Sequence, residues 1–108
     1  MSAHVLLTDG AARDLDELYA AAYDRGGAPR ADLFLDRIQD ALSRLEAVPE
    51  VGRPLPELQR LGLADGRQLR DVELRLLYRV RADAVLVVAI APAERSWQAL
   101  LQRRLLDS

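Results

Sequence analysis

The sequence of 108 residues contains no cysteine, no lysine and a single histidine. The absence of cysteine excludes disulfide bonds, thiolate metal sites and cysteine nucleophiles. His4 cannot form a histidine-based metal site alone, because such sites need several ligands. We therefore expect neither a metal site nor a cofactor.

Long apolar runs are also missing. No segment approaches the roughly 20 apolar residues that would span a bilayer, and the first residues lack the pattern of a signal peptide. We therefore expect a cytoplasmic protein without a membrane contact. A chain of this length fits a single domain, residues 1–108, which can bury roughly two thirds of the surface that the unfolded chain exposes.

All fifteen basic residues are arginines, and they are unevenly distributed. Residues 1–52 contain five arginines and ten acidic residues, whereas residues 53–108 contain ten arginines and seven acidic residues. The second half can therefore contact a polyanion locally. The net charge of −2 nevertheless provides no strong long-range attraction to nucleic acid.

The first half predicts a short strand followed by two helices. The apolar segment 4–8 favours a strand, and the helical spacing of apolar residues after it predicts a helix that Gly26-Gly27 ends. Pro29 suits the first turn of a second helix, whose apolar stripe continues until Pro49 stops it. Two helices joined by so short a turn are expected to pack as an antiparallel hairpin.

The second half predicts a long connection and then strands. Residues 48–66 contain three prolines and three glycines, so we expect an irregular segment with one helical turn near residues 57–61. The sequence then predicts three strands and a closing helix, at 67–70, 74–80, 84–91 and 94–107. The resulting order β-α-α-β-β-β-α indicates an α+β fold, in which the helical hairpin packs on one face of a mostly antiparallel four-stranded sheet.

The segment 74–81 alternates between apolar and basic residues. One face of this strand would carry Leu74, Leu76, Tyr78 and Val80, and the other Arg75, Leu77, Arg79 and Arg81. If the hairpin covers the apolar face, the arginines line a bare sheet surface that suits carboxylates or phosphates, because guanidinium groups bind both in a two-point fashion. The alternative is a solvated or helix-covered face on which the arginines pair with acidic residues.

Four segments together resemble a known family in their order and spacing. They are "LTDGAARDLDELYAAAY" (7–23), "FLDRIQDALSRLEAVPEVGRPLPEL" (34–58), "RQLR" with "LRLLYRV" (67–80) and "ERSWQALLQRRLL" (94–106). Over about residues 5–106 the chain is similar to the ParE/RelE superfamily of bacterial toxins from type II toxin–antitoxin systems. The resemblance implies a growth-inhibiting toxin that a cognate antitoxin neutralises within a toxin–antitoxin hetero-oligomer.

Two activities occur on this fold, and the resemblance favours one. RelE-like members cut mRNA on the ribosome, whereas ParE-like members bind DNA gyrase. The strand arginine of the nucleases falls on Arg75 and a basic position on Arg70. Their second catalytic arginine falls on Ala93, their tyrosine on Ala99, and Pro92 stands where a lysine is usual. Since RNA cleavage needs a general base and a general acid, the match favours a ParE-like binder over a nuclease.

The candidate residues for binding a target or the antitoxin are Arg70, Arg75, Arg79, Arg81, Arg95 and Trp97. Trp97 has a core position as its alternative, and Arg95 a structural ion pair. We expect no catalytic residue. Three hypotheses follow: a gyrase-binding toxin, a ribosome-dependent mRNA endonuclease that uses the arginines, and a weakly toxic member that mainly binds its antitoxin.

Overall fold

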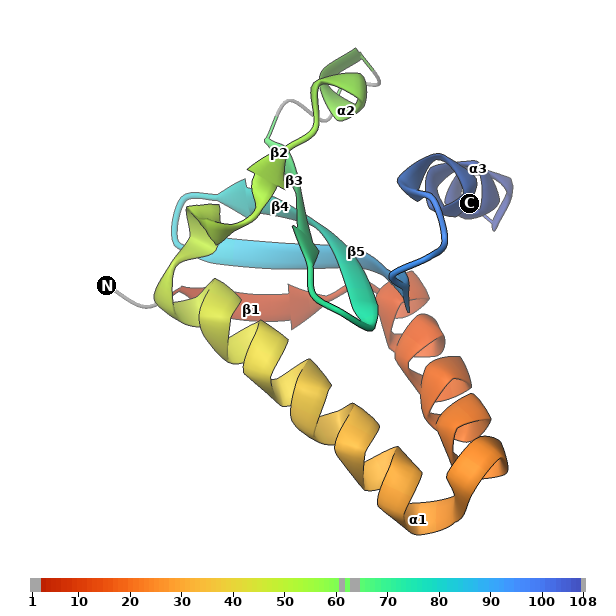
Figure 1. Cartoon of the computed structure of the whole chain (residues 1–108). Coiled ribbons are helices and arrows are strands. Elements are labelled where there is room, and N and C mark those ends of the chain that lie inside the picture. The colour runs from red at the N-terminus through yellow and green to blue at the C-terminus, as the bar shows by residue number, and fades with distance from the viewer. Residues whose placement is uncertain (1–2, 61, 63–64, 108) are drawn as a thin grey trace.

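The computed structural model of the chain describes residues 3–60, 62 and 65–107 (Figure 1). Its helices and strands follow one another in the order β1 (His4–Leu7), α1 (Asp9–Ala47), the 3-10 turn η1 (Pro49–Val51), β2 (Arg53–Pro54), α2 (Pro56–Arg60), β3 (Gly66–Arg70), β4 (Leu74–Arg81), β5 (Ala84–Pro92) and α3 (Trp97–Asp107). None of the helices in this described part of the chain is both long and apolar enough to cross a membrane.

The sheet has five strands in the order β1-β5-β4-β3-β2. β1 runs parallel to β5, and all other neighbours are antiparallel. The expected four-stranded, mostly antiparallel sheet is therefore wrong, because the sheet is mixed and gains β2 from the proline-rich connection. β2 has only two residues, one of them Pro54, so it shows no strand pattern in the sequence. The alternation along a strand also does not encode whether its neighbour runs parallel or antiparallel to it.

The expected pair of separate helices is also wrong, because residues 9–47 form one long helical element, α1. Thr8 caps its start by accepting a hydrogen bond from the backbone N–H of Ala11 at 3.1 Å. Gly26 and Gly27 leave the helical conformation, and Gly27 has a φ of +68°, which favours glycine. Pro29 is accepted in the first turn after this bend, so no loop intervenes. Figure 1 shows two arms that meet at the bend and open toward the sheet.

One face of the sheet packs against α1, as expected for the apolar face of β4. Tyr78 and Leu76 are fully buried there. The buried residues of this first core are Ala11, Phe34, Ile38, Ala41, Leu45, Leu69, Leu74, Leu76, Tyr78, Val85, Val87 and Ile90. Val80 is half-buried against the same core, which confirms the expected facing of all four apolar positions.

The opposite face of the sheet is covered as well. A second core joins α2 and α3 to the sheet and consists of Leu55, Leu58, Leu77, Ala89, Ala91, Leu100 and Leu101. The expectation of a bare sheet face beside the arginines is therefore wrong. Alternation along β4 correctly predicted which residues share this face, but it contains no information on the distant helices that cover it.

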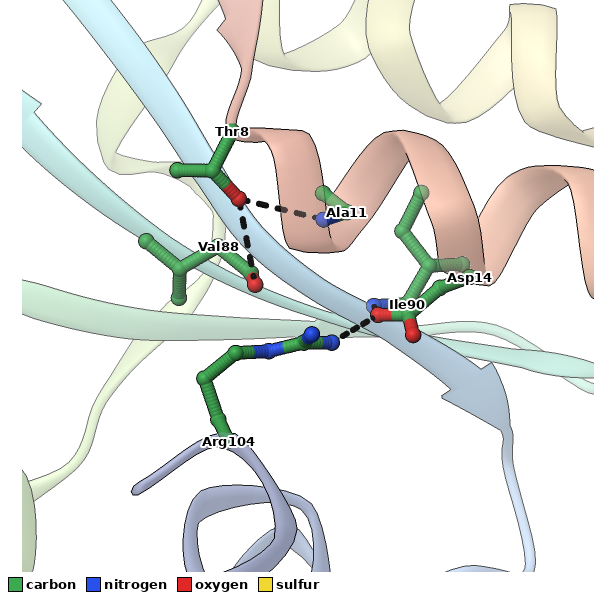
Figure 2. A network of polar contacts seen from close by, with 6 residues as sticks. All are labelled: Thr8, Ala11, Asp14, Val88, Ile90 and Arg104. Carbon is green, nitrogen blue, oxygen red and sulfur yellow. Dashed lines mark hydrogen bonds and ion pairs between the residues drawn. The ribbon is translucent and has the colours of Figure 1, made fainter. Parts of the chain in front are cut away.

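A buried carboxylate connects α1, β5 and α3 (Figure 2). β1 ends opposite Val87, so the next part of β5 has no strand on that side. Asp14 takes its place by accepting a hydrogen bond from the backbone N–H of Ile90 at 3.0 Å. Asp14 also forms an ion pair with Arg104, so α3 is held to the helix that crosses the other face of the sheet.

Candidate binding site around Arg75

Arg75 is the second residue of β4 and is only 8% exposed. Its Nη1 donates a hydrogen bond to Oε1 of Gln68 on β3, and its Nη2 donates to the backbone carbonyl of Ala93 at 2.9 Å. Its Nε is buried and has no hydrogen-bond partner among the described residues. Burial, followed by the charge of Arg70, lowers the pKa of Arg75 below its ordinary value. The guanidinium thus links β3, β4 and the segment after β5.

Arg70 and Arg95 lie at the same end of the sheet. Arg70 is paired directly with Arg75 across β3 and β4. Arg95 follows Ala93 by two residues, in a turn closed by a hydrogen bond from its N–H to the carbonyl of Pro92 at 3.0 Å. Both side chains are exposed, and within the described residues neither forms an ion pair. The structure therefore brings together three of the six predicted residues.

The other three predicted residues are placed differently. Arg79 and Arg81 both contact Asp65, with nitrogen–oxygen distances of 2.9 and 3.3 Å. Burial raises the pKa of Asp65, but hydrogen bonds from Arg79, its own backbone and Arg81 outweigh this effect and hold the pKa below its ordinary value of 3.8. The alternative of an acidic partner is therefore confirmed for these two arginines. Trp97 begins α3, and its side chain lies outside the described residues.

Tyr78 lies on the opposite face of β4 and holds the loop that precedes β2. Its hydroxyl accepts a hydrogen bond from the N–H of Gly52 and donates one to the carbonyl of Pro49, each at 2.8 Å. A Cβ atom at Gly52 would lie 2.5 Å from this hydroxyl, so only glycine fits. Arg67 donates to the carbonyl of Gly52 at 2.8 Å. The hydroxyl of Tyr78 therefore uses both its donor and an acceptor position to hold this loop.

Among the described residues, the end of the sheet that carries Arg75 has no tyrosine and no histidine. The three tyrosines of the chain are Tyr19, Tyr23 and Tyr78, and its histidine is His4 on β1. None of them belongs to the strand end that carries Arg75. In the described part of the chain, no three His, Cys, Asp or Glu residues converge as metal ligands. The site is suited to binding an anionic group by charge.

Two residues that were not predicted from the sequence decide the hydrogen-bonding state of these arginines. Gln68 is buried in β3 and accepts from Arg75, and Asp65 precedes β3 and binds two arginines. The only sign of Gln68 in the sequence is an uncharged polar residue inside a predicted strand. Its position opposite Leu77 follows from the hairpin register, which the sequence did not specify.

A separate cavity of about 220 Å³ lies between the two arms of α1 and the turn from β3 to β4. Its lining is mostly apolar and includes Leu18, Phe34, Val72 and Leu74. None of the six predicted residues lines it. The cavity is therefore distinct from the arginine cluster.

Comparisons with known proteins agree on one family. A family model described as "ParE toxin of type II toxin-antitoxin system, parDE" matches residues 5–97. Toxin ParE1 of Mycobacterium tuberculosis, from two strains, is 34% identical over 88 residues, which cover 82% of this chain and 86% of that protein.

Two solved structures share the fold. A chain of the chromosomal ParDE toxin–antitoxin system from P. aeruginosa superposes with a TM-score of 0.68 at 22% identity, covering 86% of this chain and 98% of that one. A chain of the toxin–antitoxin complex RelBE2 from M. tuberculosis superposes with a TM-score of 0.61 at 27% identity, covering 85% of this chain and 92% of that one.

Proposed function

Because the chain belongs to the ParE family of toxins from type II toxin–antitoxin systems, we propose that it inhibits growth by binding DNA gyrase and that a cognate antitoxin neutralises it. The toxin would act in the cytoplasm, without breaking a bond itself. The proposal of an antitoxin partner is supported by the structural relatives, which are parts of the ParDE and RelBE2 toxin–antitoxin systems.

The observation that carries the binding mechanism is the state of Arg75. Its guanidinium is buried and already donates to Gln68 and to the carbonyl of Ala93. A nuclease that cleaves by attack of the 2′-OH needs a general base, a general acid and an accessible cation. The described residues of this strand end include no tyrosine or histidine. The geometry therefore favours recognition over catalysis.

Within this proposal, the six residues have different roles. Arg70 and Arg95 are exposed and present guanidinium groups to a carboxylate-rich surface of the target or the antitoxin. Arg75 positions the strand and the segment after Ala93, and adds positive charge behind them. Arg79 and Arg81 act indirectly, because both form ion pairs with Asp65. Trp97 is retained as a candidate anchor residue for the partner at the start of α3.

The experiment is regulated expression of the chain in bacteria without an antitoxin. We expect filamentous growth and an SOS response, and we expect the purified protein to inhibit DNA supercoiling by gyrase. Rapid loss of translation with cleaved mRNA would instead establish the RelE-like nuclease. Undisturbed growth at full expression would establish a weakly toxic member that mainly binds its antitoxin.

Matched variants test the surface. We expect Arg70→Ala and Arg95→Ala to weaken gyrase inhibition by roughly tenfold or more, as for residues that dominate an interface. Arg13→Ala is the control, because Arg13 is exposed on α1 and has no ion-pair partner among the described residues. Equal inhibition by all three variants would remove the arginine cluster from the proposal.

A further inference from the structure

The cavity of about 220 Å³ between the two arms of α1 has an apolar wall that belongs to the first core. Phe34 and Leu74 are buried members of this core, and Leu18 and Ala22 pack against it. An apolar cavity of about 150 Å³ is large enough to bind benzene. By the same measure, this cavity has room for an apolar group of roughly nine nonhydrogen atoms.

The rim of the cavity leaves apolar side chains in contact with solvent. Leu33 on the second arm is 43% exposed, and Val72 in the turn from β3 to β4 is 88% exposed. The turn is held by Asp71, whose carboxylate accepts from the N–H groups of Glu73 and Leu74 at 2.8 and 2.6 Å. Val72 therefore stays at the rim, where a bound molecule would cover it together with Leu33.

Two arginines line the cavity at the bend of α1. Arg25 precedes the bend and Arg30 follows it, both are exposed, and neither has an ion-pair partner among the described residues. The bend brings the two arms close together, because a Cβ atom at Gly26 would lie 2.8 Å from the Cβ of Arg30. This end of the cavity thus has an uncompensated positive charge.

The acidic residues of the lining lie at the other end, beside the sheet. Glu73 is compensated by an ion pair with Arg37, in which Nε and Oε2 are 3.2 Å apart. Glu94 follows β5, is exposed and has no ion-pair partner in the described part of the chain. Figure 1 shows the bend of α1 directed away from the sheet. An anionic group is therefore attracted to the bend and repelled from the end of β5.

We propose that this cavity binds a small organic carboxylate, whose apolar body packs against Phe34 and whose carboxylate group lies between Arg25 and Arg30. The planar guanidinium group suits this role, because it binds carboxylates in a two-point fashion. A single protein side chain offers either a carboxylate or an apolar group of this size, so a small molecule matches the cavity better than a second copy of the chain does. The inference depends on neither the gyrase target nor the antitoxin.

The test is a titration of the purified, isotope-labelled full chain with 3-phenylpropionate, followed by NMR of the backbone amides. We expect saturable shifts at Leu18, Leu33, Phe34 and Leu74, with a dissociation constant of about 0.1–1 mM, since so small a ligand gains little free energy in total. The neutral 3-phenylpropionamide should bind about fivefold more weakly or worse, and 3-phenylpropylamine more weakly still. Propionate, which lacks the apolar body, should cause no saturable shift.

Variants separate the two halves of the site. Arg25→Gln/Arg30→Gln should bind 3-phenylpropionate as weakly as the original chain binds the amide, about a fivefold loss, and should bind the amide within about twofold of the original. Arg13→Gln/Arg44→Gln is the matched control, because both residues are exposed on α1 outside the cavity; it should bind both compounds as the original does. Ala22→Leu fills the cavity and should weaken both compounds by about tenfold.

The proposal is overturned if no saturable shift occurs at about 10 mM 3-phenylpropionate, if the amine binds equally well, or if the two double variants bind alike. Shifts confined to the surroundings of Arg70 and Arg95 would also overturn it. A dimer that dissociates when Val72 is changed to glutamate would instead assign the cavity to a second copy. The variants at exposed arginines keep the core intact, and no assay contains gyrase, so failure here is distinguishable from failure of the proposed function.

Discussion

Replacing Tyr78 with phenylalanine removes a single hydroxyl from the first core without adding an atom. That hydroxyl accepts from the N–H of Gly52 and donates to the carbonyl of Pro49, each at 2.8 Å. A typical hydrogen bond contributes about 0.5–1.5 kcal/mol, and a buried group left without a partner costs about 1–3 kcal/mol. Gly52 is buried, so water cannot easily replace the lost acceptor. We therefore expect a loss of about 2–4 kcal/mol in the free energy of unfolding.

This loss is large for a domain of about 100 residues. It corresponds to a decrease of roughly 8–32 °C in melting temperature, at about 4–8 °C for each kcal/mol. Urea denaturation followed by circular dichroism measures it directly. Tyr23→Phe is the matched control, because Tyr23 is 52% exposed on α1, and it should change stability by less than about 0.5 kcal/mol.

Replacing Tyr78 should also change how the free energy of unfolding depends on pH. Burial raises the pKa of Tyr78 above 10.0, and the opposing effects of the Gly52 N–H and Arg67 are smaller. A group whose pKa is raised by folding contributes stability that is fully present below its unfolded value and is lost as the pH rises through the folded value. Stability should therefore fall above about pH 10, and less steeply in Tyr78→Phe. Equal stability of the two phenylalanine variants, or equal alkaline slopes, would refute this reasoning.

Two further predictions concern carboxylates. Asp14→Ala should cost about 2–4 kcal/mol, because it removes the acceptor of the buried Ile90 N–H and one ion pair of Arg104. Amide exchange in α3 should accelerate, whereas the exposed neighbour Asp16→Ala should change neither quantity. Folding lowers the pKa of Asp65, so its contribution to stability is present above pH 3.8 and lost as the pH falls below it. Asp65→Asn should therefore flatten the acid side of the stability curve measured by urea denaturation, and an unchanged curve relative to the exposed control Asp83→Asn would contradict the assignment.

The helical part of the fold was largely predictable because its signals are local. Thr8 precedes the helix, its side chain accepts from Ala11, and Gly26-Gly27 interrupts the helical conformation. These features depend on residues within one or two turns. The continuity of α1 through the bend was not predicted, because Gly-Gly followed by Pro29 is equally compatible with two separate helices.

The candidate site was predictable only in part. Strand alternation correctly grouped Arg75 with Leu77 and separated both from Tyr78. It did not reveal that Arg75 is buried beside Gln68, or that Asp65 binds Arg79 and Arg81. Gln68 lies on β3 and Asp65 lies in the segment before it. Their positions relative to the arginines depend on the register of the β3–β4 hairpin, which no local rule specifies.

The order of residues alone was enough to predict which side chains share a face, that Gly26-Gly27 interrupts the helical conformation, and which toxin family the chain resembles. These properties follow from short-range periodicity, capping and motif spacing. Tertiary folding was needed to establish the parallel partner of β1, the covering of the arginine face by α2 and α3, and the burial of Asp14 and Arg75. Each of these depends on which distant segments pack together, and that choice minimises the exposed apolar area of the whole chain.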